Sequence, residues 1–291
     1  MATGQGPVVQ SAILRRTLAQ LRRDKALTQE DVAEGLEWPP SKLIRIEGGL
    51  SGITKTDLDA LISHYGLESA AERDRLQQLN REARERVWWD VYRHQISPEY
   101  LNYVGYEAGA SFIRQFPGTV IPGLVQTADY AEALTRISVN DEEKITEIVD
   151  LRMQRQSELA RRSNRPRQYY VLDEAVIRRH VGIETNPAIM PGQLRSIADR
   201  AANDELVTVR VIPFPKGAHA GLSGPFTVLE FDGLPDLLYL DAGRGPLVMV
   251  IGDDTRVADY RDNFELLLQQ ALREDESIEF IQSAAEEMSN E

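Results

Sequence analysis

The stretches TQEDVA at residues 28–33 and PPSKLIRIE at residues 39–47 decide the fold of the first part of the chain. Thr28 suits the start of a helix, because its hydroxyl accepts a bond from the free backbone N–H groups of a first turn. Val32 and Ala33 fall on one face at helical spacing, and the small Ala33 side chain lets a second helix approach closely. The first stretch therefore predicts a short helix that packs against a neighbour.

A second helix is predicted to begin at Pro39–Pro40, since proline is tolerated in a first helical turn and nowhere deeper. Leu43 and Ile46 face inward, and two glycines at 48–49 end the helix. Two short helices joined in this way predict a helix-turn-helix, and with it DNA binding and regulation rather than catalysis. The outward side chains have the chemistry that contacts phosphates and base edges: Ser41, Lys42 and Arg45.

Apolar stripes on both sides extend this helix pair into a bundle. Upstream, Leu14, Leu18 and Leu21 recur at helical spacing, and downstream residues 58–65 carry a further apolar face that ends at a glycine. Four or five short helices in about 60 residues make a core of roughly the smallest viable size. The alternative interpretation is a small helical bundle whose polar face is merely solvated.

Taken in order, residues 11–67 resemble the Xre/Cro-type helix-turn-helix domain. The resemblance implies that the helix starting near Pro39 enters the major groove. It also implies that Glu47 pairs with an arginine of the first helix, Arg15 or Arg22. Base-contacting positions fall on Pro40, Ser41 and Arg45, and Gln29 and Lys42 lie beside the phosphate backbone. The predicted DNA-binding residues are Thr28, Gln29, Pro40, Ser41, Lys42 and Arg45.

Two residues depart from the Xre/Cro-type pattern. Glu37 stands where the turn normally carries glycine, and positive φ at a residue with a Cβ costs about 1 kcal/mol. Pro39 stands where Ser or Thr would cap the recognition helix, which loses roughly 1 kcal/mol of capping. We expect Gly35 to absorb part of the strain in the turn.

The chain has a net charge of −13, which would oppose binding to the negatively charged DNA if it were spread evenly along the sequence. Residues 1–86 hold 13 Lys or Arg and 13 Asp or Glu, so the whole acidic excess lies after residue 86. A neutral reader domain binds non-specific DNA weakly, because that affinity scales with the number of neutralised phosphates. Specific binding would then depend on a homodimer, formed through residues beyond 87, that combines two half-sites. The plainer alternative is that the acidic balance only keeps the protein soluble.

Composition excludes several other classes of protein. The chain has no cysteine, which excludes disulfides, thiolate zinc sites and iron–sulfur clusters. It has no apolar run long enough to span a membrane, and residues 1–10 lack the apolar core of a signal peptide, so they are predicted to form a flexible tail. We expect a cytoplasmic, nucleoid-associated protein that does not interact with membranes.

The fold class predicted for the whole chain is an N-terminal all-α helix-turn-helix bundle followed by a larger α+β domain. A connecting helix is expected over 68–87, a boundary near residue 87, the α+β domain over 88–280 and a frayed acidic tail over 281–291. Strands are predicted at 168–172, 206–212, 226–231 and 237–240, with a short extended run from residue 112. Helices are predicted at 99–107, 128–137, 142–163, 175–181, 192–202 and 260–273.

A second resemblance covers roughly residues 88–280. It rests on FPGTVIPGLVQTADYA (116–131), RMQRQ (152–156), LDEA (172–175), MPGQL (190–194) and VRVIPF (209–214). This part is similar to the C-terminal domain of actinobacterial Xre regulators of the WhiJ type, which act in Streptomyces development. The resemblance implies a domain that receives a signal or a small protein encoded next to it, an arrangement likened to an antitoxin with its toxin. LDAG at 240–243 departs from the glutamate that more often follows this strand.

No set of residues indicates catalysis, a metal site or a cofactor. The four histidines lie far apart in the sequence and lack the spacing of metal ligands. Asp173-Glu174 is better explained as the cap of a following helix than as an acid/base pair, since adjacent side chains diverge. Asp253-Asp254 is expected to close a turn, and GAHAGLSG at 217–224 lacks the ending of a phosphate loop. We therefore expect no catalytic residues, no metal and no cofactor.

Three features are candidates for contact with a partner or ligand, each with a structural alternative. Trp88 and Trp89 are either a hot spot of a protein–protein interface or part of a domain core. Gln126, Thr127 and Tyr130 either line a pocket at a helix start or serve as turn and cap. Six arginines either hold an anionic ligand or pair with nearby carboxylates: Arg152, Arg155, Arg161, Arg162, Arg165 and Arg167.

These observations favour a sequence-specific DNA-binding transcriptional regulator whose C-terminal domain receives a small protein partner or ligand. The partners expected are a double-stranded DNA operator, a second copy of the chain and a small protein encoded next to it. The alternative is the DNA-binding antitoxin of a two-protein system. An enzyme fused to a DNA-binding anchor is a third class, for which no catalytic set is found. Ligand or partner contact is predicted at Trp88, Trp89, Gln126, Thr127 and Tyr130.

Overall fold

The computed structural model describes residues 6–240, 248–252 and 254–290. It divides into two compact units, Met1–Asp90 and Val91–Glu291, which are described separately. A boundary is predicted near residue 87, and the structure divides the chain slightly later, after Asp90. Trp88 and Trp89 therefore belong to the first unit and not to the α+β domain in which they were expected.

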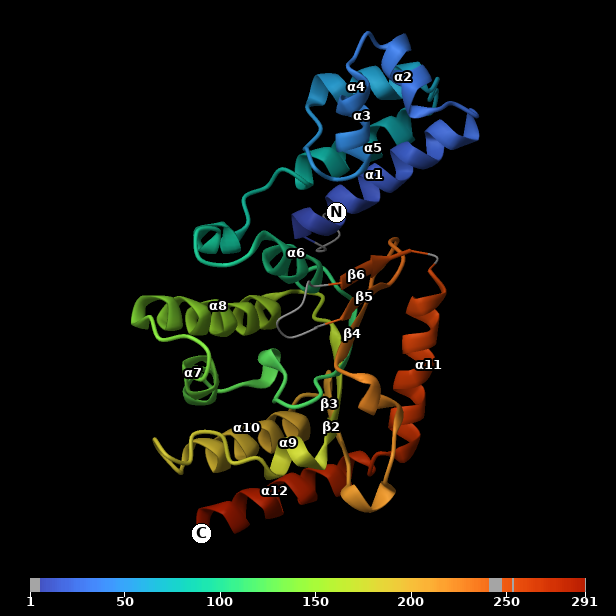
Figure 1. Cartoon of the computed structure of the whole chain (residues 1–291). Helices are drawn as coiled ribbons and strands as arrows, with labels where there is room; N and C mark the ends of the chain where they lie inside the picture. Colours follow the sequence, from blue (N-terminus) through green and yellow to red (C-terminus); the bar gives the residue numbers. More distant parts are fainter. Residues whose placement is uncertain (1–5, 241–247, 253, 291) are drawn as a thin grey trace. The chain divides into compact units, whose positions relative to one another are not determined.

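The first unit is a bundle of helices (Figure 1). Its core consists of leucine and isoleucine side chains at helical spacing, with Leu14, Leu43 and Leu58 fully buried. The expected connecting helix is part of this bundle, because it packs against the first and fourth helices with Leu76 buried. The helices are α1 (Gly6–Asp24), α2 (Gln29–Gly35), α3 (Pro40–Glu47), α4 (Lys55–His64) and α5 (Ala70–Glu82), followed by the short η1 (Trp88–Tyr92).

The prediction of a flexible tail over 1–10 is wrong for residues 6–10, which form the first turns of α1. Val9 and Gln10 are buried there, because Val9 and Ile13 continue the apolar stripe of Leu14 and Leu18 towards the N-terminus. Residues 1–5 lie outside the described residues.

The second unit is built on a six-stranded mixed sheet in the order β3-β2-β1-β4-β5-β6. β1, β2 and β3 run parallel, and β4, β5 and β6 continue the sheet in antiparallel pairs. The sequence pattern predicts all of these strands except β6. The strands are β1 (Phe112–Phe116), β2 (Arg167–Asp173), β3 (Val207–Ile212), β4 (Phe226–Glu230), β5 (Leu237–Leu240) and β6 (Val248–Ile251).

Helices cover both faces of this sheet, with α11 on one side and α6 and α8 on the other (Figure 1). The predicted fold class is confirmed: an all-α helix-turn-helix bundle followed by a larger α+β unit. The helices are α6 (Pro98–Glu107), α7 (Ala128–Arg136), α8 (Glu142–Arg161), α9 (Glu174–Arg178), α10 (Ile189–Asn203), α11 (Thr255–Gln270) and α12 (Glu274–Asn290), with short helical turns η2 (Gly123–Val125), η3 (Phe214–Lys216) and η4 (Ala220–Ser223).

Strand alternation sends different residues to the two faces of the sheet. Phe116, Phe226 and Val228 join a buried apolar cluster with Phe264 and Leu267 of α11. The residues between them point to the opposite face, towards α6 and α8. One face is thus filled by a closely packed core, while the other borders the cavity described below.

Two predictions near the C-terminus need correction. The expected frayed acidic tail is the second half of α12, which packs on α10 and β3. Ile281, Ala284, Ala285 and Met288 are buried at i, i+3, i+4 and i+7, an apolar face hidden within an acidic run. The expected turn at 253–254 is instead a helix start, because Asp254 caps α11 by accepting a bond from Arg256 N. Asp253, residue 291 and positions 241–243 of the LDAG departure lie outside the described residues.

We predict that Ile281→Ala destabilises the second unit by about 2–4 kcal/mol, because it leaves a cavity under α12. Thermal unfolding of the full chain, followed by far-UV circular dichroism, measures the change. Glu286→Ala on the exposed side of the same helix is the control and should change stability by less than about 0.5 kcal/mol. Equal stability of Ile281→Ala and the parent would show that this half of α12 contributes little.

Candidate nucleic-acid interface and C-terminal cavity

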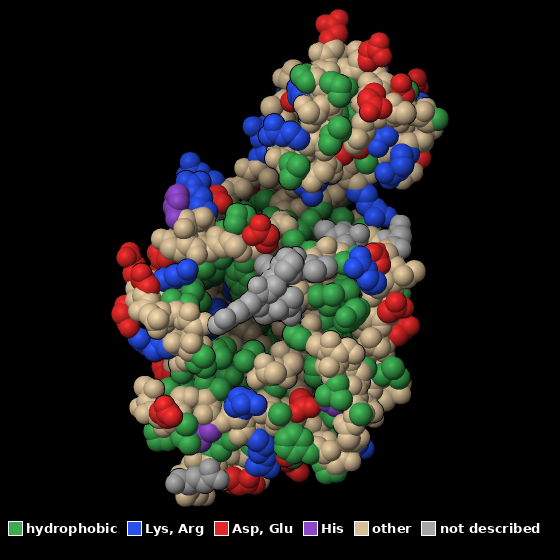
Figure 2. Space-filling model, viewed as in Figure 1, with side chains coloured by type: hydrophobic (Ala, Val, Ile, Leu, Met, Phe, Trp, Pro, Cys, Tyr) green, Lys and Arg blue, Asp and Glu red, His purple; other side chains and the backbone are tan. Residues whose placement is uncertain are grey.

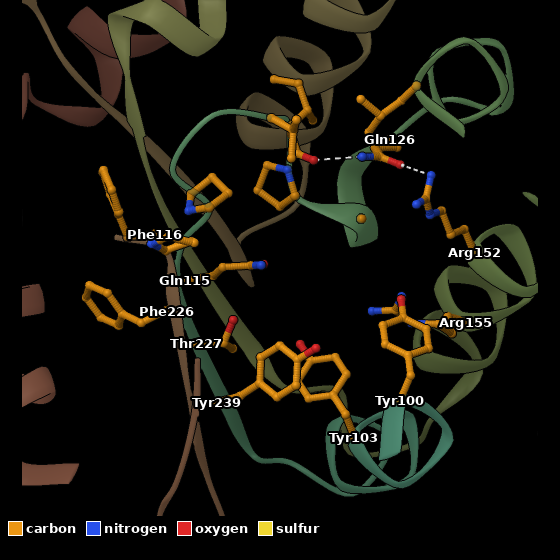
Figure 3. Close-up of a pocket in the computed structure, with 17 residues that line it drawn as sticks. Tyr100, Tyr103, Gln115, Phe116, Gln126, Arg152, Arg155, Phe226, Thr227 and Tyr239 are labelled. Carbon is orange, nitrogen blue, oxygen red and sulfur yellow. Dashed lines mark hydrogen bonds between the residues drawn. The ribbon is translucent and has the colours of Figure 1, made fainter. Parts of the chain in front are cut away.

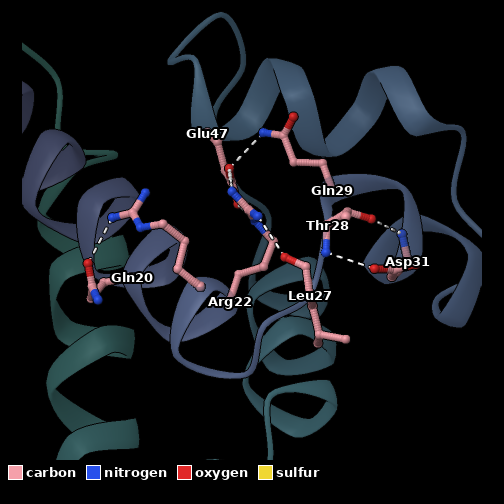
Figure 4. Close-up of polar contacts among 8 residues, drawn as sticks. Gln20, Arg22, Leu27, Thr28, Gln29, Asp31 and Glu47 are labelled. Carbon is pink, nitrogen blue, oxygen red and sulfur yellow. Dashed lines mark hydrogen bonds and ion pairs between the residues drawn. The ribbon is translucent and has the colours of Figure 1, made fainter.

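The start of α2 is held by a reciprocal cap (Figure 4). The Thr28 hydroxyl accepts a hydrogen bond from Asp31 N at 3.0 Å, and the Asp31 carboxylate accepts one from Thr28 N at 2.8 Å. These bonds lower the pKa of Asp31. Two backbone donors that a helix start leaves free are thereby satisfied, which fixes the entry of the chain into α2.

A bidentate ion pair holds α3 against α1 (Figure 4). Arg22 Nε and Nη2 donate to the two carboxylate oxygens of Glu47 at 2.8 and 2.9 Å, and Arg22 Nη1 donates to Leu27 O at 2.8 Å. Glu47 also accepts a bond from Gln29 Nε2 at 2.7 Å. The bonds to Glu47 raise the pKa of Arg22. Of the two arginines considered from the sequence, Arg22 is therefore the partner of Glu47.

The turn between α2 and α3 has the strain expected from its sequence. Glu37 has φ of 55°, the left-handed conformation that normally favours glycine. Pro39 precedes α3 without a side-chain hydrogen bond to its first turn. Gly35 does not absorb the strain as expected: a Cβ there would lie 2.4 Å from His64 Cε1. Gly35 also has no positive φ, and its close neighbour is the His64 side chain of α4.

The six predicted DNA-binding residues fall into two groups. Pro40, Ser41 and Arg45 are exposed on α3, and neither Ser41 nor Arg45 makes a side-chain hydrogen bond or ion pair with the part of the chain that the structure describes. Ile44, whose apolar side chain is 46% exposed, lies beside them. Ile44 is not among the predicted DNA-binding residues, although an apolar residue one turn after Ser41 on a polar helix face is a signal that identifies it.

The other three residues are engaged within the first unit. Thr28 caps α2, and Gln29 donates to Glu47. Lys42 Nζ donates to Asp57 at 2.6 Å and lies 3.9 Å from the centre of the Trp38 ring. Burial opposes ionisation of Asp57, but its bond with Lys42 outweighs this and lowers its pKa. The charge of Lys42 is thus largely neutralised before any DNA arrives.

The five predicted partner or ligand residues are divided between the two units, Trp88 and Trp89 in the first and Gln126, Thr127 and Tyr130 in the second. Trp88 and Trp89 pack edge to face with ring centres 5.2 Å apart, and Trp89 is buried. Thr127 caps α7 and donates its backbone N–H to Gln193 at 2.7 Å, while the buried Tyr130 hydroxyl accepts a bond from Ile121 N. These contacts agree with the turn-and-cap alternative. Gln126 alone among the five lines a cavity of the second unit.

That cavity has a volume of about 150 Å³ and lies between the sheet, α6, α8 and the loop of residues 117–126 (Figure 3). Its sheet wall is a row of neighbouring positions on three strands. Gln115 of β1 pairs with Thr227 of β4, which pairs with Tyr239 of β5. Because paired residues point to the same face, these three side chains share the wall opposite α11.

The α6 wall carries Tyr100 and Tyr103, with Glu107 one turn behind them. Arg155 of α8 donates from Nε and Nη2 to Glu107 at 2.9 and 2.6 Å, and both side chains are almost fully buried. Burial opposes the charge of this guanidinium, yet the Glu107 carboxylate raises its pKa. Burial raises the pKa of Tyr103, whose hydroxyl donates to Glu107. This network is an internal ion pair with its hydrogen bonds satisfied.

Arg152, one turn before Arg155, is held differently. Its Nη1 lies within hydrogen-bond distance of three uncharged oxygens: Gln126 Oε1 at 3.4 Å, Ala131 O at 3.3 Å and Thr135 Oγ1 at 3.2 Å. Burial lowers the pKa of Arg152. Within the described ranges no carboxylate forms an ion pair with it.

The arginine series therefore divides between the two alternatives drawn from the sequence. Arg155 pairs with Glu107, Arg161 with Glu158 and Arg165 with Asp204, as the pairing interpretation expects. Arg162 donates to Ala110 O, and Arg167 is exposed. Arg152 alone in the series faces the cavity as a cation without an ion pair in the described parts of the chain.

Asp173 and Glu174 have structural roles. Asp173 caps α9, as predicted, by accepting a bond from Ala175 N at 2.7 Å. Its other oxygen lies 2.9 Å from Nε2 of the buried His219, which comes from the glycine-rich loop. Glu174 accepts a bond from Phe214 N. Among the described residues no three His, Asp or Glu side chains are grouped as metal ligands would be.

Comparison with known families agrees with this division of the chain. Residues 13–76 match a helix-turn-helix domain. Residues 100–283, more than half of the chain, match a family described as a domain of unknown function, DUF5753. The chain belongs to the DUF5753 family. Every residue that lines the cavity lies within the DUF5753 match.

Searches of curated proteins and of solved structures found no match. In the described parts of the chain, none of the helices has the length and apolar character needed to cross a membrane.

We predict that Arg22→Met destabilises the first unit by about 3 kcal/mol, because it leaves the largely buried Glu47 without its counter-charge. All three tryptophans, Trp38, Trp88 and Trp89, lie in the first unit, so tryptophan fluorescence during urea unfolding reports on it. The neighbouring exposed Arg23→Met is the control, with an expected change below about 0.5 kcal/mol. If the two variants unfold alike, the ion pair does not hold α3 in place.

Proposed function

We propose that this protein is a sequence-specific DNA-binding transcriptional regulator of the Xre type. In this proposal its C-terminal unit, similar to that of WhiJ-type regulators, receives a small protein partner or a ligand. The helix-turn-helix match supports the DNA-binding role, and one observation carries the assignment of the site. On α3, Ser41 and Arg45 are exposed and have no side-chain hydrogen bond or ion pair with the residues that the structure describes, whereas Gln29, Lys42 and Glu47 are engaged in holding α3 in place.

The exposed face of α3 offers a donor set suited to base edges. Arg45 can donate two hydrogen bonds to guanine, Ser41 can donate or accept, and Ile44 can contact a thymine methyl group. A recognition helix needs rigid support for such contacts, and the Arg22–Glu47 pair supplies it through α1. We therefore place the base-reading surface on Pro40, Ser41, Ile44 and Arg45.

The charge distribution supports a dimeric mode of binding. Basic and acidic side chains both appear on the visible face of the first unit (Figure 2), and Lys42 is paired with Asp57. Few cations are therefore left for phosphates. Residues 1–86 have zero net charge and Asp90 adds one negative charge, so a single first unit gains little affinity from phosphates. A homodimer that presents two reader units to two half-sites compensates for this weakness.

The proposal also covers the location of the protein in the cell and an alternative function. A regulator of this kind acts on cytoplasmic, nucleoid-associated DNA, and we propose no catalytic activity for it. The second candidate function is a DNA-binding antitoxin, favoured by the acidic excess after residue 86, which would attract a basic partner. Co-purification of the small protein encoded next to it, with loss of that protein's toxicity, would favour the antitoxin.

We predict that Arg45→Ala weakens binding to the specific operator by about 1–3 kcal/mol and relaxes the preference at one base pair of each half-site. Operator fragments are first selected from genomic DNA with the parent protein and then titrated in gel-shift assays. Arg75→Ala, which removes an exposed charge from α5, is the matched control and should bind almost as the parent does. Unchanged operator affinity of Arg45→Ala would contradict the assignment of α3 as reader.

A separate prediction concerns assembly. The full chain should sediment as a dimer and bind an operator of two half-sites, because one neutral reader has too little electrostatic affinity alone. The segment 1–90, which has its own buried core, should be a monomer and bind the same operator about a hundredfold more weakly. A full-length monomer that binds one half-site tightly would rule out this mode.

A further inference from the structure

We propose that the cavity of the C-terminal unit binds a small organic carboxylate of about the size of benzoate, with its carboxylate on the guanidinium of Arg152. The inference rests on the proposed function in one respect, the role of this unit as the receiver of a signal. It names the class of ligand and the residues that bind it.

The charge balance of the cavity is the first argument. Two guanidinium groups, those of Arg152 and Arg155, border it (Figure 3), and the carboxylate of Glu107 neutralises only Arg155. A guanidinium removed from water needs a counter-charge, or its burial is costly. The polar groups that contact Arg152, three oxygens near Nη1 and the Tyr100 hydroxyl, are uncharged, and within the described chain no carboxylate forms an ion pair with this guanidinium. A carboxylate supplies both the negative charge and the planar acceptor that a guanidinium binds best.

The sheet wall adds further polar groups that the fold does not use. The side chains of Gln115 and Thr227 point into the cavity (Figure 3), and neither makes a side-chain hydrogen bond with the described residues. Thr227 is nevertheless only 2% exposed. Buried polar groups are normally hydrogen-bonded, so this pair is available to a ligand. Together with Arg152, they provide polar contacts from two opposite walls.

The rest of the lining is apolar or aromatic. The rings of Tyr103 and Tyr239 pack with centres 4.1 Å apart at 32°, and Ile121 and Leu134 complete the surface. Such a lining suits a flat hydrocarbon body rather than a sugar or an extended peptide. A guanidinium that has no ion pair within the described residues, next to an aromatic surface, indicates an amphipathic anion.

Size narrows the class further. A cavity of about 150 Å³ is comparable to the apolar cavity that accommodates benzene, so a ligand of roughly six to nine non-hydrogen atoms fits it. Nucleotides, fatty acids and peptides are larger than 150 Å³, so this cavity would hold only part of such a molecule. Inorganic phosphate would satisfy Arg152 but would leave the aromatic surface uncovered. We therefore favour a compact monocarboxylate over a phosphate.

The full-length protein is titrated by isothermal calorimetry with propionate, benzoate and phenylacetate, and with benzamide and inorganic phosphate as the contrasting probes. At least one carboxylate should bind saturably with one site per chain. Benzamide, which keeps the ring and loses the charge, should bind at least about tenfold more weakly than benzoate. Equal binding of benzoate and benzamide, tighter binding of phosphate, or no binding of any carboxylate at millimolar concentration would overturn the proposal.

Variants locate the site. Arg152→Gln should weaken the best carboxylate at least about tenfold, and Thr227→Val, which keeps the shape and removes the hydroxyl, about threefold. Arg161→Gln removes an exposed charge from the same helix and should bind as the parent does. If Arg152→Gln does not fold, Leu134→Trp provides the second test, because it fills the cavity and should abolish binding. Parent-like affinity in Leu134→Trp would place the ligand elsewhere and contradict the proposal.

These titrations contain no DNA, so their failure is separate from failure of the proposed regulatory function. Operator affinity is measured on the same preparations without carboxylate. If the parent protein binds the operator but none of the carboxylates, only the ligand assignment is contradicted. If the parent protein binds a carboxylate but selects no genomic DNA, the proposed function is contradicted and the cavity remains a carboxylate site.

Discussion

A guanidinium group withdrawn from water must find negative charge, and this requirement organises both units of the protein. In the first unit Arg22 reaches from α1 to Glu47 at the end of α3, with two parallel hydrogen bonds. In the second unit Arg155 reaches from α8 to Glu107 of α6 in the same bidentate way. Each pair connects two helices that are distant in sequence, and each breaks only at the cost of an unpaired buried charge.

The same requirement separates structural from available residues. Around α3, Lys42 and Gln29 are used to neutralise or bond carboxylates of the bundle. Arg45 has no such partner within the described chain, and it is the residue best placed to meet an outside acceptor. In the second unit the corresponding contrast lies between Arg155, which forms an ion pair, and Arg152, which has only uncharged partners among the described residues. Lys42 and Arg45 are both cations, and so are Arg155 and Arg152. Only the side chains that surround each residue show which one has a structural role and which one is available to a ligand.

Much of the architecture could be predicted from local patterns. The helix-turn-helix follows from a cap, a helical stripe and two prolines within about twenty residues, and these signals act through near neighbours. The prediction was less successful where composition concealed periodicity. At the polar start of the chain, the buried residue Val9 was not recognised as part of a helix. At the acidic end, the buried apolar face that begins at Ile281 was not recognised either. β6 has only four residues and pairs with β5, and its apolar run Val248–Ile251 is a short strand signal that the prediction missed.

By itself the sequence determined the fold class, the order of most elements and the face of α3 that carries Ser41 and Arg45, because helical and strand periodicities are properties of short segments. Only the tertiary structure decided which arginine pairs with Glu47 and where the cavity lies. Gln115, Thr227 and Arg152 come from β1, β4 and α8, and only sheet pairing and helix packing bring them together. Local patterns carry no information about such distant contacts, since the free energy that selects them arises when the whole core is packed.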